Sequence, residues 1–266
     1  MQTSLISLID ILDSNIISKT GVIEWGSPVP SFGNISNSWV ATLGLNPSNR
    51  EFIDDTGNEL KGGKRRFQTL SSLRLKSWSE IDSSDLYLIT ESCNNYFQNN
   101  PYDRWFKVLD LIISGIDSSF YSQYSSACHL DLIPFATKQK WNYLSKDQKT
   151  SLLEISSHTL GSLICESPIK LLILNGQSVI DNFQLLAQIQ LEKEKKTEWS
   201  LPRHTSNDVQ GIAYHGVINN ISGIPLNRDI LVLGFNHNLQ SSYGITSKVL
   251  LEIQKWVRLS TKEFTI

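Results

Sequence analysis

The chain has 266 residues with a formal net charge of −2 at pH 7, and apolar residues make up 40 % of it. This composition is typical of a globular protein and excludes an intrinsically disordered one. The balanced charge gives no overall sign of nucleic-acid binding, so any contact with a polyanion must come from a local basic segment. The length favours one α/β domain over residues 1–266 with a substantial buried core.

Three widely separated cysteines, Cys93, Cys128 and Cys165, form no C-x-x-C pair. Their spacing excludes zinc ribbons and iron–sulfur sites, and free thiols fit a reducing cytoplasm. The first apolar residues have the spacing of an amphipathic helix rather than of a signal peptide, and no apolar stretch reaches membrane length. We expect a cytoplasmic protein with no membrane partner, no metal and no cofactor.

In the first half of the chain, apolar periodicity predicts a helix over 3–18, a strand over 38–45, helices over 65–76 and 102–114, and a strand at about 126–133. The second half predicts helices over 145–165, 178–196 and 246–259, core strands over 168–176 and 228–235, and an extra, hairpin-paired strand over 210–222. Continuously apolar strands that alternate with helices are typical of a parallel sheet covered on both faces. We therefore predict a three-layer α/β/α sandwich around a mostly parallel four-stranded sheet.

The sequence lacks the motifs of several common enzyme classes. It contains no G-x-x-x-x-G-K-[ST], no G-x-G-x-x-G, no G-x-S-x-G and no H-E-x-x-H. Phosphate-binding loops, dinucleotide sites, nucleophile elbows and zinc protease sites each need one of these patterns. Nucleotide hydrolysis, NAD chemistry and serine-triad hydrolysis therefore lose their usual support.

Polar groups follow three of the predicted strands. The first strand ends in Asn46-Pro47-Ser48, the second in Asp131-Leu-Ile-Pro134, and the last in Asn236-His-Asn-Leu-Gln240. Because the carboxyl ends of parallel strands meet at one edge of a sheet, we expect these groups to form a site there. Many strands end in polar turn residues that form no site. If only one of these three ends were present, we would favour that structural interpretation.

These ends resemble motifs of the uracil-DNA glycosylase superfamily, closest to its mismatch-specific and single-strand-selective branches. Gly44-Leu-Asn-Pro-Ser48 is similar to the water-activating motif G-[IM]-N-P-G, and Asp131-Leu-Ile-Pro134 is similar to the base-recognition motif N-x-x-P. Asn236-His-Asn-Leu-Gln-Ser-Ser242 occupies the place of the last motif, H-P-S-P. The resemblance implies a metal-independent enzyme that flips a nucleotide out of DNA and hydrolyses its N-glycosidic bond.

The same resemblance implies two catalytic residues. Asn46 would position the attacking water through its side-chain carbonyl, and His237 would stabilise the charge that develops on the leaving base. Asn46 could instead only cap a turn, and a lone histidine at a strand end is often structural. Asn238 stands where the family has proline, so Asn236 or Asn238 is the alternative to His237.

Asp131 stands where the family's uracil readers have asparagine, and this departure points to cytosine. An ionised carboxylate accepts a hydrogen bond from the cytosine amine, and a buried protonated one would also donate to the ring. A pairing with His129 would instead lower its pKa, and Asp131 could also merely hold the Thr137 loop. Ser48 is small where the uracil-specific branch has tyrosine, so a 5-substituted cytosine would fit. Pro134 completes the expected base-binding set.

Further residues are candidates for holding the base and the DNA. Phe67, or else Phe32, would stack on the base, although Phe67 also suits a core position. A basic segment within 61–76 contains Lys64, Arg65 and Arg66, which we expect at DNA phosphates unless the segment is only a solvated face. In the last motif, Leu239 would be a wedge in the base stack or a core residue. The expected phosphate donors there are Gln240, Ser241 and Ser242.

The sequence therefore predicts a monomeric, monofunctional DNA glycosylase that removes a modified cytosine, 5-substituted and for example glucosylated, and leaves an abasic site. Excision of normal cytosine would be ruinous, so the expected substrate is foreign or phage DNA and the expected role is antiviral defence. The alternatives are repair of uracil or other deaminated bases, a non-catalytic DNA-binding module on the same fold, and a small-molecule hydrolase, for example of nucleosides.

Overall fold

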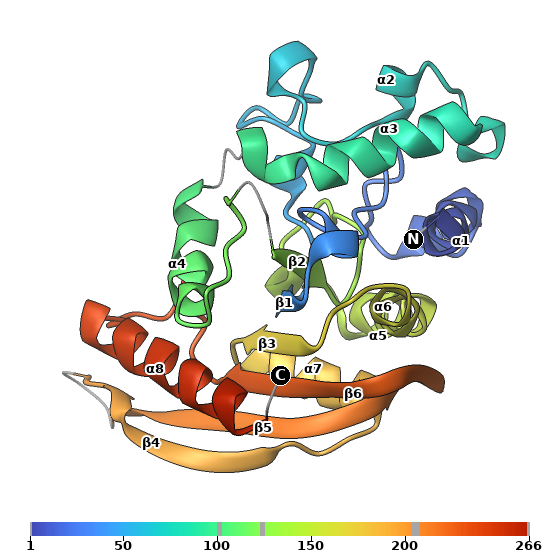
Figure 1. Cartoon of the computed structure of the whole chain (residues 1–266). Helices are drawn as coiled ribbons and strands as arrows, with labels where there is room; N and C mark the ends of the chain where they lie inside the picture. The colour runs from blue at the N-terminus through green and yellow to red at the C-terminus, as the bar shows by residue number, and fades with distance from the viewer. Residues whose placement is uncertain (1, 100–102, 123–125, 204–207, 265–266) are drawn as a thin grey trace.

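The computed structural model describes residues 2–99, 103–122, 126–203 and 208–264, which form a mixed six-stranded sheet with helices around it (Figure 1). The strand order is β2-β1-β3-β6-β5-β4. The parallel strands are β1 (Val40–Gly44), β2 (Ala127–Asp131), β3 (Leu171–Asn175) and β6 (Ile224–Phe235). β5 (Val209–Ile221) and β4 (Glu192–Leu201) continue the sheet antiparallel. The predicted α/β class is confirmed, and the described residues form six strands where four were predicted.

Helices cover both faces of the parallel strands, which is why β1, β2 and β3 are buried along their whole length. Successive side chains of a strand point to opposite faces. Val40 belongs to the core cluster shared with α4 (Asp103–Ser114) and α8 (Ser247–Glu263). Its neighbour Ala41 belongs to the cluster shared with α6 (Thr159–Cys165) and α7 (Gln177–Ala187). Figure 1 shows α4 and α8 together on one side of the sheet.

The two antiparallel strands account for the difference from the predicted sheet. The extra strand predicted over 210–222 is confirmed as β5, which forms a hairpin with β6. β4 was predicted as the end of a helix over 178–196, and that prediction is wrong beyond Ala187. The helix ends where Gln188 takes a left-handed φ of 55°. Because β4 is an edge strand whose first half is exposed, its charged residues show no apolar alternation.

The remaining helices differ from the prediction mainly in their ends. The helix predicted over 3–18 is α1 (Gln2–Asp13) followed by a short 3₁₀ helix, and the one over 145–165 is two helices, α5 (Lys146–Ile155) and α6. The predicted 65–76 helix is only α2 (Leu70–Leu73), which ends at a left-handed Arg74. For the 102–114 helix, residue 102 lies outside the described residues and α4 confirms the rest. α8 confirms the last one.

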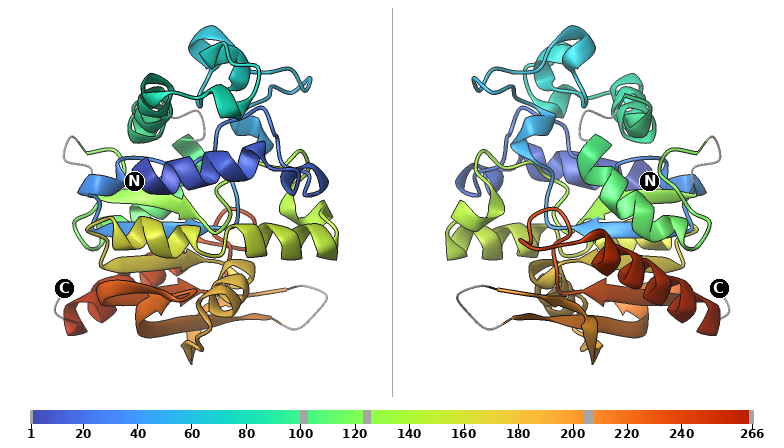
Figure 2. Two further views of the ribbon diagram at one scale, coloured as in Figure 1. Left: turned by 90° about the vertical axis from the view of Figure 1, so that its right-hand side faces the viewer. Right: turned by 90° about the vertical axis from the view of Figure 1, so that its left-hand side faces the viewer.

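Helix α3 (Ser83–Asn94) had no sequence prediction, and it helps to close a third core cluster. α1 lies against both α3 and α6, as the two side views show (Figure 2). The cluster contains Leu8 of α1, Ile89 of α3 and Leu152 of α5, all fully buried. None of the helices in the described ranges is long and apolar enough to cross a membrane.

The parallel strands deliver their carboxyl ends to one edge of the sheet. Gly44 at the end of β1 pairs with Asp131 at the end of β2, and Asn175 at the end of β3 pairs with Phe235 at the end of β6. The chain segments that follow these four ends therefore meet. They include Asn46 and the loop that begins at Asn236.

Burial on β3 gives a test of the core. Leu172 is fully buried, whereas Leu185 on α7 is 71 % exposed. We expect Leu172→Ala to lower the free energy of unfolding by about 2–5 kcal/mol, because it leaves a cavity among packed side chains. Leu185→Ala is the matched control and should change it by less than about 0.5 kcal/mol. Urea denaturation measures both, and equal losses would contradict this packing.

Candidate active site

A cavity of about 550 Å³ lies at the carboxyl edge of the parallel strands. Open α/β sheets bind their ligands at this position. Its lining includes Phe32, Asn46, Ser48, Glu51, Trp105, His129, Asp131, Asn175 and Asn238. A neighbouring pocket of about 370 Å³ at the start of α7 shares Asn175 and Asn238 and adds Ser241 and Ser242. The three predicted strand ends therefore do meet around one site.

Asn46 follows β1, and its side-chain amide is held by two hydrogen bonds. Its Nδ2 donates to Thr137 Oγ1 over 3.0 Å and to the Pro47 carbonyl oxygen over 3.1 Å. The Thr137 hydroxyl donates its own proton to the Gln139 carbonyl, so it can only accept from Asn46. This fixes which end of the amide faces Thr137. The carbonyl oxygen of Asn46 accepts no hydrogen bond from any residue in the described ranges, and Asn46 lines the cavity.

Asp131 is buried at the end of β2, where it pairs with His129. Its Oδ1 lies 3.5 Å from His129 Nε2, and His129 Nδ1 lies 2.7 Å from Thr42 Oγ1. The two side chains share one face of β2 because residues two apart point the same way. A Cβ at Gly44 would collide with Asp131 Oδ1 and crowd His129 Nε2, so glycine is required at this position of β1.

The structure bears on two of the alternatives that the sequence leaves open for Asp131. The pairing with His129 is present. The Thr137 hydroxyl bonds to Asn46 and Gln139, and within the part of the chain that the structure describes no hydrogen bond joins Asp131 to the Thr137 loop. Asp131 therefore offers its carboxyl oxygens to the cavity and lies beside the imidazole of His129.

Aromatic rings form one wall of the cavity around His129. The ring centroids of Phe32, Trp105 and Phe106 lie 5.5, 5.4 and 5.3 Å from that of His129. Phe32 is also joined to His129 through the backbone: its N–H donates to the His129 carbonyl over 2.8 Å and its carbonyl accepts over 2.9 Å. This isolated antiparallel bridge lies on the outer side of β2.

Two predicted base-binding residues, Phe67 and Pro134, are not among the described residues that line the cavity. Phe67 is 1 % exposed and stacks on Tyr96 at 5.3 Å, so it supports Phe32 from within the core. Of the two candidates for stacking, Phe32 is the one that lines the cavity. Pro134 is buried and its carbonyl accepts from the Val29 N–H, outside the cavity lining of the described residues.

Glu51 was missed by the sequence predictions, although it stands five residues after Asn46. Its side chain is 3 % exposed and lines the cavity. Tyr96 Oη donates to its Oε1 over 3.0 Å, and Arg66 Nη1 donates to its Oε2 over 3.4 Å. Burial raises the pKa of Glu51 to about 7, against the opposing effects of Arg66 and Tyr96. A glutamate in a polar loop gives no sequence signal of such burial.

The loop after β6 is arranged differently from the prediction. His237 is buried, and its Nε2 is bonded to the Trp199 carbonyl at 2.8 Å. It is not among the described residues that line the cavity, whereas Asn238, a predicted alternative, is. Leu239 is 5 % exposed in the core, so it is not placed to act as a wedge. Tyr243, which is 73 % exposed, is the large apolar side chain that this loop presents to solvent.

Gln240 and Asn175 tie the loop to the rest of the site. Gln240 Oε1 accepts from Asn175 Nδ2 over 2.7 Å, and Gln240 Nε2 donates to the Trp105 carbonyl over 3.2 Å. Asn175 Oδ1 in turn accepts from the Leu239 N–H. Gln240 is thus a structural link between β3, the loop and α4. Ser241 and Ser242 line the neighbouring pocket, where they are open to a ligand.

The predicted basic segment is only partly available for DNA. Lys64 is exposed, and Arg66 faces inward to Glu51. Arg65 is half-buried, with its Nε unpaired among the described residues. Acidic residues that the sequence places outside this segment lie near it: Lys64 contributes to the lowered pKa of Asp54, which is caused mainly by the Thr56 hydroxyl. The positive potential of the segment is therefore weaker than its sequence indicates.

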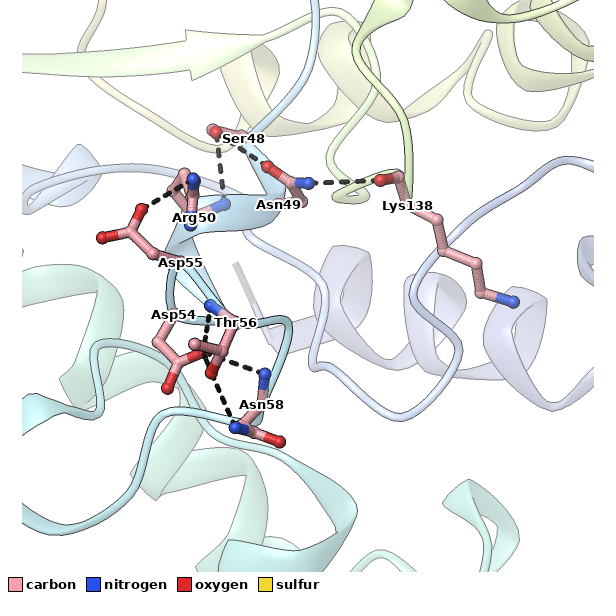
Figure 3. A network of polar contacts seen from close by, with 8 residues as sticks. All are labelled: Ser48, Asn49, Arg50, Asp54, Asp55, Thr56, Asn58 and Lys138. Atoms are coloured by element: carbon pink, nitrogen blue, oxygen red, sulfur yellow. Dashed lines mark hydrogen bonds and ion pairs between the residues drawn. The ribbon is translucent and has the colours of Figure 1, made fainter.

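Polar contacts hold the loop at the rim of the cavity (Figure 3). Ser48 caps the following 3₁₀ helix by accepting from the Arg50 N–H over 3.2 Å. Asn49 Nδ2 donates to the Lys138 carbonyl over 3.1 Å, and Arg50 Nη2 lies 2.7 Å from Asp55 Oδ1. Asp54 Oδ1 closes the turn by accepting from the N–H groups of Thr56 and Asn58. Ser48 lines the cavity as predicted and leaves its rim uncrowded.

The described residues contain no group of three or more histidine, cysteine, aspartate or glutamate side chains that could hold a metal ion. The site instead offers an amide carbonyl, two buried carboxyl groups, an imidazole and aromatic rings. Such a set can orient a water molecule, hold a planar heterocycle and exchange protons. Among the residues that line the cavity, sequence reasoning missed Glu51, Asn175, Trp105 and Phe106. The amphipathic pattern of 102–114 gives no sign that two of its aromatic rings reach a cavity.

His237 yields a prediction about pH. Burial lowers its pKa below the ordinary value, and the Trp199 carbonyl opposes this. The unfolded chain therefore binds a proton at a higher pH than the folded chain, so stability falls as the pH drops below about 6.5. When the pH falls from 7.5 to 5.5, we expect the free energy of unfolding to decrease less in His237→Gln than in the wild-type protein. For one proton the limit is about 1.4 kcal/mol per pH unit. Identical pH dependence in urea denaturation would contradict the prediction.

No protein-family model matches this sequence, and the search of curated proteins gives no match either. The interpretation of the site therefore depends on its own geometry and on the motif resemblance. Asn46, Asp131 and Asn238 come from the three strand ends that carry the resemblance, and all three line one cavity.

Proposed function

We propose that this chain is a DNA glycosylase with a fold related to the uracil-DNA glycosylase superfamily. The observation that carries the proposal is the Asn46 amide. Its NH₂ group is fixed by the hydrogen bond to Thr137. Its side-chain carbonyl oxygen accepts no hydrogen bond from the described residues, and Asn46 lies at the wall of the cavity. A carbonyl held in this way is suited to accept a hydrogen bond from water and to aim the water's lone pair at a bound substrate.

The cavity supplies the other needs of base excision. A nucleotide flipped out of DNA must be stacked on its face and bound on its edge. Phe32, Trp105 and Phe106 provide the aromatic wall, and Asp131 provides an acceptor for the edge. The water held by Asn46 then bonds to C1′ of the sugar, while the C1′–N1 bond breaks and its electron pair goes to the base. Strand cleavage by a glycosylase needs a lysine that forms a Schiff base with the sugar. Among the described residues that line the cavity the one lysine is Lys140, and it is exposed. We therefore expect hydrolysis without strand cleavage.

Asp131 favours cytosine over uracil as the base. Thr42 Oγ1 lies 2.7 Å from His129 Nδ1, and His129 Nε2 lies 3.5 Å from Asp131 Oδ1, so the tautomer that carries its proton on Nε2 directs a donor at the Asp131 carboxylate. Such a carboxylate accepts from the N4 amine of cytosine, whereas uracil presents a carbonyl oxygen at this position. The small Ser48 at the rim and the volume of about 550 Å³ leave room for a 5-substituent, for example a glucosylated one. The proposed role is therefore attack on modified foreign DNA, in antiviral defence.

For the DNA backbone, the exposed Lys64 and the serines at 241 and 242 are the proposed contacts. Tyr243 takes the place of Leu239 as the proposed side chain that fills the gap left by the flipped base. Arg66 and Gln240 have structural partners instead. We propose no metal or cofactor for the reaction.

The first test is base release from short DNA that carries cytosine, uracil, 5-hydroxymethylcytosine or its glucosylated form, followed by alkali cleavage at the abasic site. We expect Asn46→Ala to lower the rate on the modified cytosine by about 100-fold or more, because the water loses its positioning group. Asn219→Ala, an exposed asparagine on β5, is the matched control and should keep the wild-type rate. DNA binding without base release from any substrate would favour the binding module instead.

A second prediction concerns the base. Asp131→Asn replaces an acceptor by an amide that can also donate to a carbonyl oxygen. One polar contact to cytosine is lost and one to uracil is gained, so we expect the preference for modified cytosine over uracil to fall by about 10-fold or more. The ratio of single-turnover rates on the two substrates measures this change. Release of uracil by the wild-type protein would favour the repair alternative and contradict the assignment of cytosine.

A further inference from the structure

We propose that Glu51 is the acid that protonates the base as it leaves. The proposal rests on the proposed glycosylase function and adds a catalytic residue to it. Cytosine leaves poorly as an anion, so a proton donor in the cavity answers a need that neither Asn46 nor an ionised Asp131 meets.

The position of Glu51 follows from the local fold. Pro47 and Ser48 turn the chain after β1, and Ser48 caps the 3₁₀ helix Asn49–Glu51. The last residue of this helix points inward, where it is 3 % exposed and lines the same cavity as Asn46 and Asp131. A buried glutamate without a ligand costs free energy, which favours a functional reason for its place.

Charged and titratable side chains surround Glu51, and Arg50, which is paired with Asp55, and the exposed Lys140 also line its cavity. Tyr96 and Arg66 donate to its two oxygens, over 3.0 and 3.4 Å, and Asp131 and His129 line the cavity with it. Burial and the nearby Asp131 raise the pKa of Glu51, while Arg66 and Tyr96 lower it, and the result is about 7. A general acid works best with a pKa near the working pH, because it then holds the proton and still releases it.

The two carboxyl groups of the cavity thus lie in different environments. Asp131 Oδ1 lies 3.5 Å from His129 Nε2. Glu51 accepts from Tyr96 over 3.0 Å and from Arg66 over 3.4 Å, and its burial outweighs both contacts and raises its pKa. Two carboxyl groups in different surroundings of one site can divide the acid and acceptor roles between them. Asp131 therefore holds the base, and Glu51 donates the proton.

The step balances as follows. The Glu51 carboxyl proton moves to N3 or O2 of the base, the C1′–N1 bond breaks, and its electron pair enters the ring. The oxygen of the water held by Asn46 bonds to C1′, and one proton of that water goes to solvent. The products are the neutral base, the abasic sugar and the Glu51 carboxylate, which takes a proton back from solvent. No oxidant, reductant or metal is needed.

The test is Glu51→Gln, which keeps the shape and loses the transferable proton. On DNA with 5-hydroxymethylcytosine we expect a single-turnover rate about 100-fold lower at pH 7, with the Kd for the DNA unchanged. The wild-type rate should fall as the pH rises above about 7, and this dependence should be absent from the variant. Glu198→Gln, an exposed glutamate on β4, is the matched control with a wild-type rate and profile.

A second substrate separates acid catalysis from a structural role. Fluorine at C5 makes cytosine a better leaving group that needs less protonation, so the rate loss from Glu51→Gln should be smaller on 5-fluorocytosine than on 5-methylcytosine. An equal loss on both would overturn the proposal, as would a variant rate within about threefold of wild type with the same pH profile. If wild type releases no base from any substrate, the proposed function and this proposal both fail. If wild type is active and Glu51→Gln equals it, only this proposal fails.

The stability of the variant provides a check on folding. Because the pKa of Glu51 is raised in the folded state, its contribution to stability is lost as the pH rises through about 7. Glu51→Gln should therefore have a higher urea midpoint than wild type at pH 8.5. A lower midpoint, together with the loss of activity on both substrates, would show that Glu51 is a structural residue and would overturn the proposal.

Discussion

The parallel register between β1 and β2 places Gly44 directly beside Asp131, and the whole site depends on the missing side chain there. A Cβ at this point would strike the Asp131 carboxyl and crowd the His129 ring. With glycine, the carboxyl and the imidazole lie over the end of β1 and reach the cavity. The turn that follows Gly44 then brings Asn46 and Glu51 to the same space. One backbone position thus sets the spacing of all four polar groups.

The polar groups of the cavity differ in what holds them, and their chemistry follows from that difference. Asn46 is fixed by a hydroxyl that can only accept, so its carbonyl is left for a ligand. Asp131 is next to an imidazole, and Glu51 is enclosed by a phenol and one guanidinium. The two carboxyl groups are buried alike, and they differ in the groups that face them. An apolar wall on one side and fixed polar groups on the other are what recognition of a planar heterocycle requires.

The sequence was sufficient to predict the four parallel strands, the β5 hairpin and the meeting of three strand ends, because continuous apolar runs and their polar ends are local signals. It could not predict β4, whose exposed edge has no apolar alternation, or the depth of the side chains in the loops. Phe67 and Phe32 have the same residue type, and only the packing puts one behind the other. Glu51 and Arg66 read as solvated charges, yet they meet in the interior. The position of His237 is set by its hydrogen bond to the Trp199 carbonyl, and Trp199 lies on β4, the strand that the sequence did not predict.

The backbone bridge between Phe32 and His129 also limits the growth of the sheet. The outer strands of a sheet present unpaired N–H and C=O groups that can template the addition of another chain. On the β2 side, Phe32 takes up both backbone groups of His129. On the far side, β4 alternates glutamate and lysine along its exposed half, which disfavours pairing with another strand. The segment that supplies Phe32 to the aromatic wall thus also covers part of an edge that could otherwise pair with another chain, so a change at Phe32 puts both solubility and the pocket at risk.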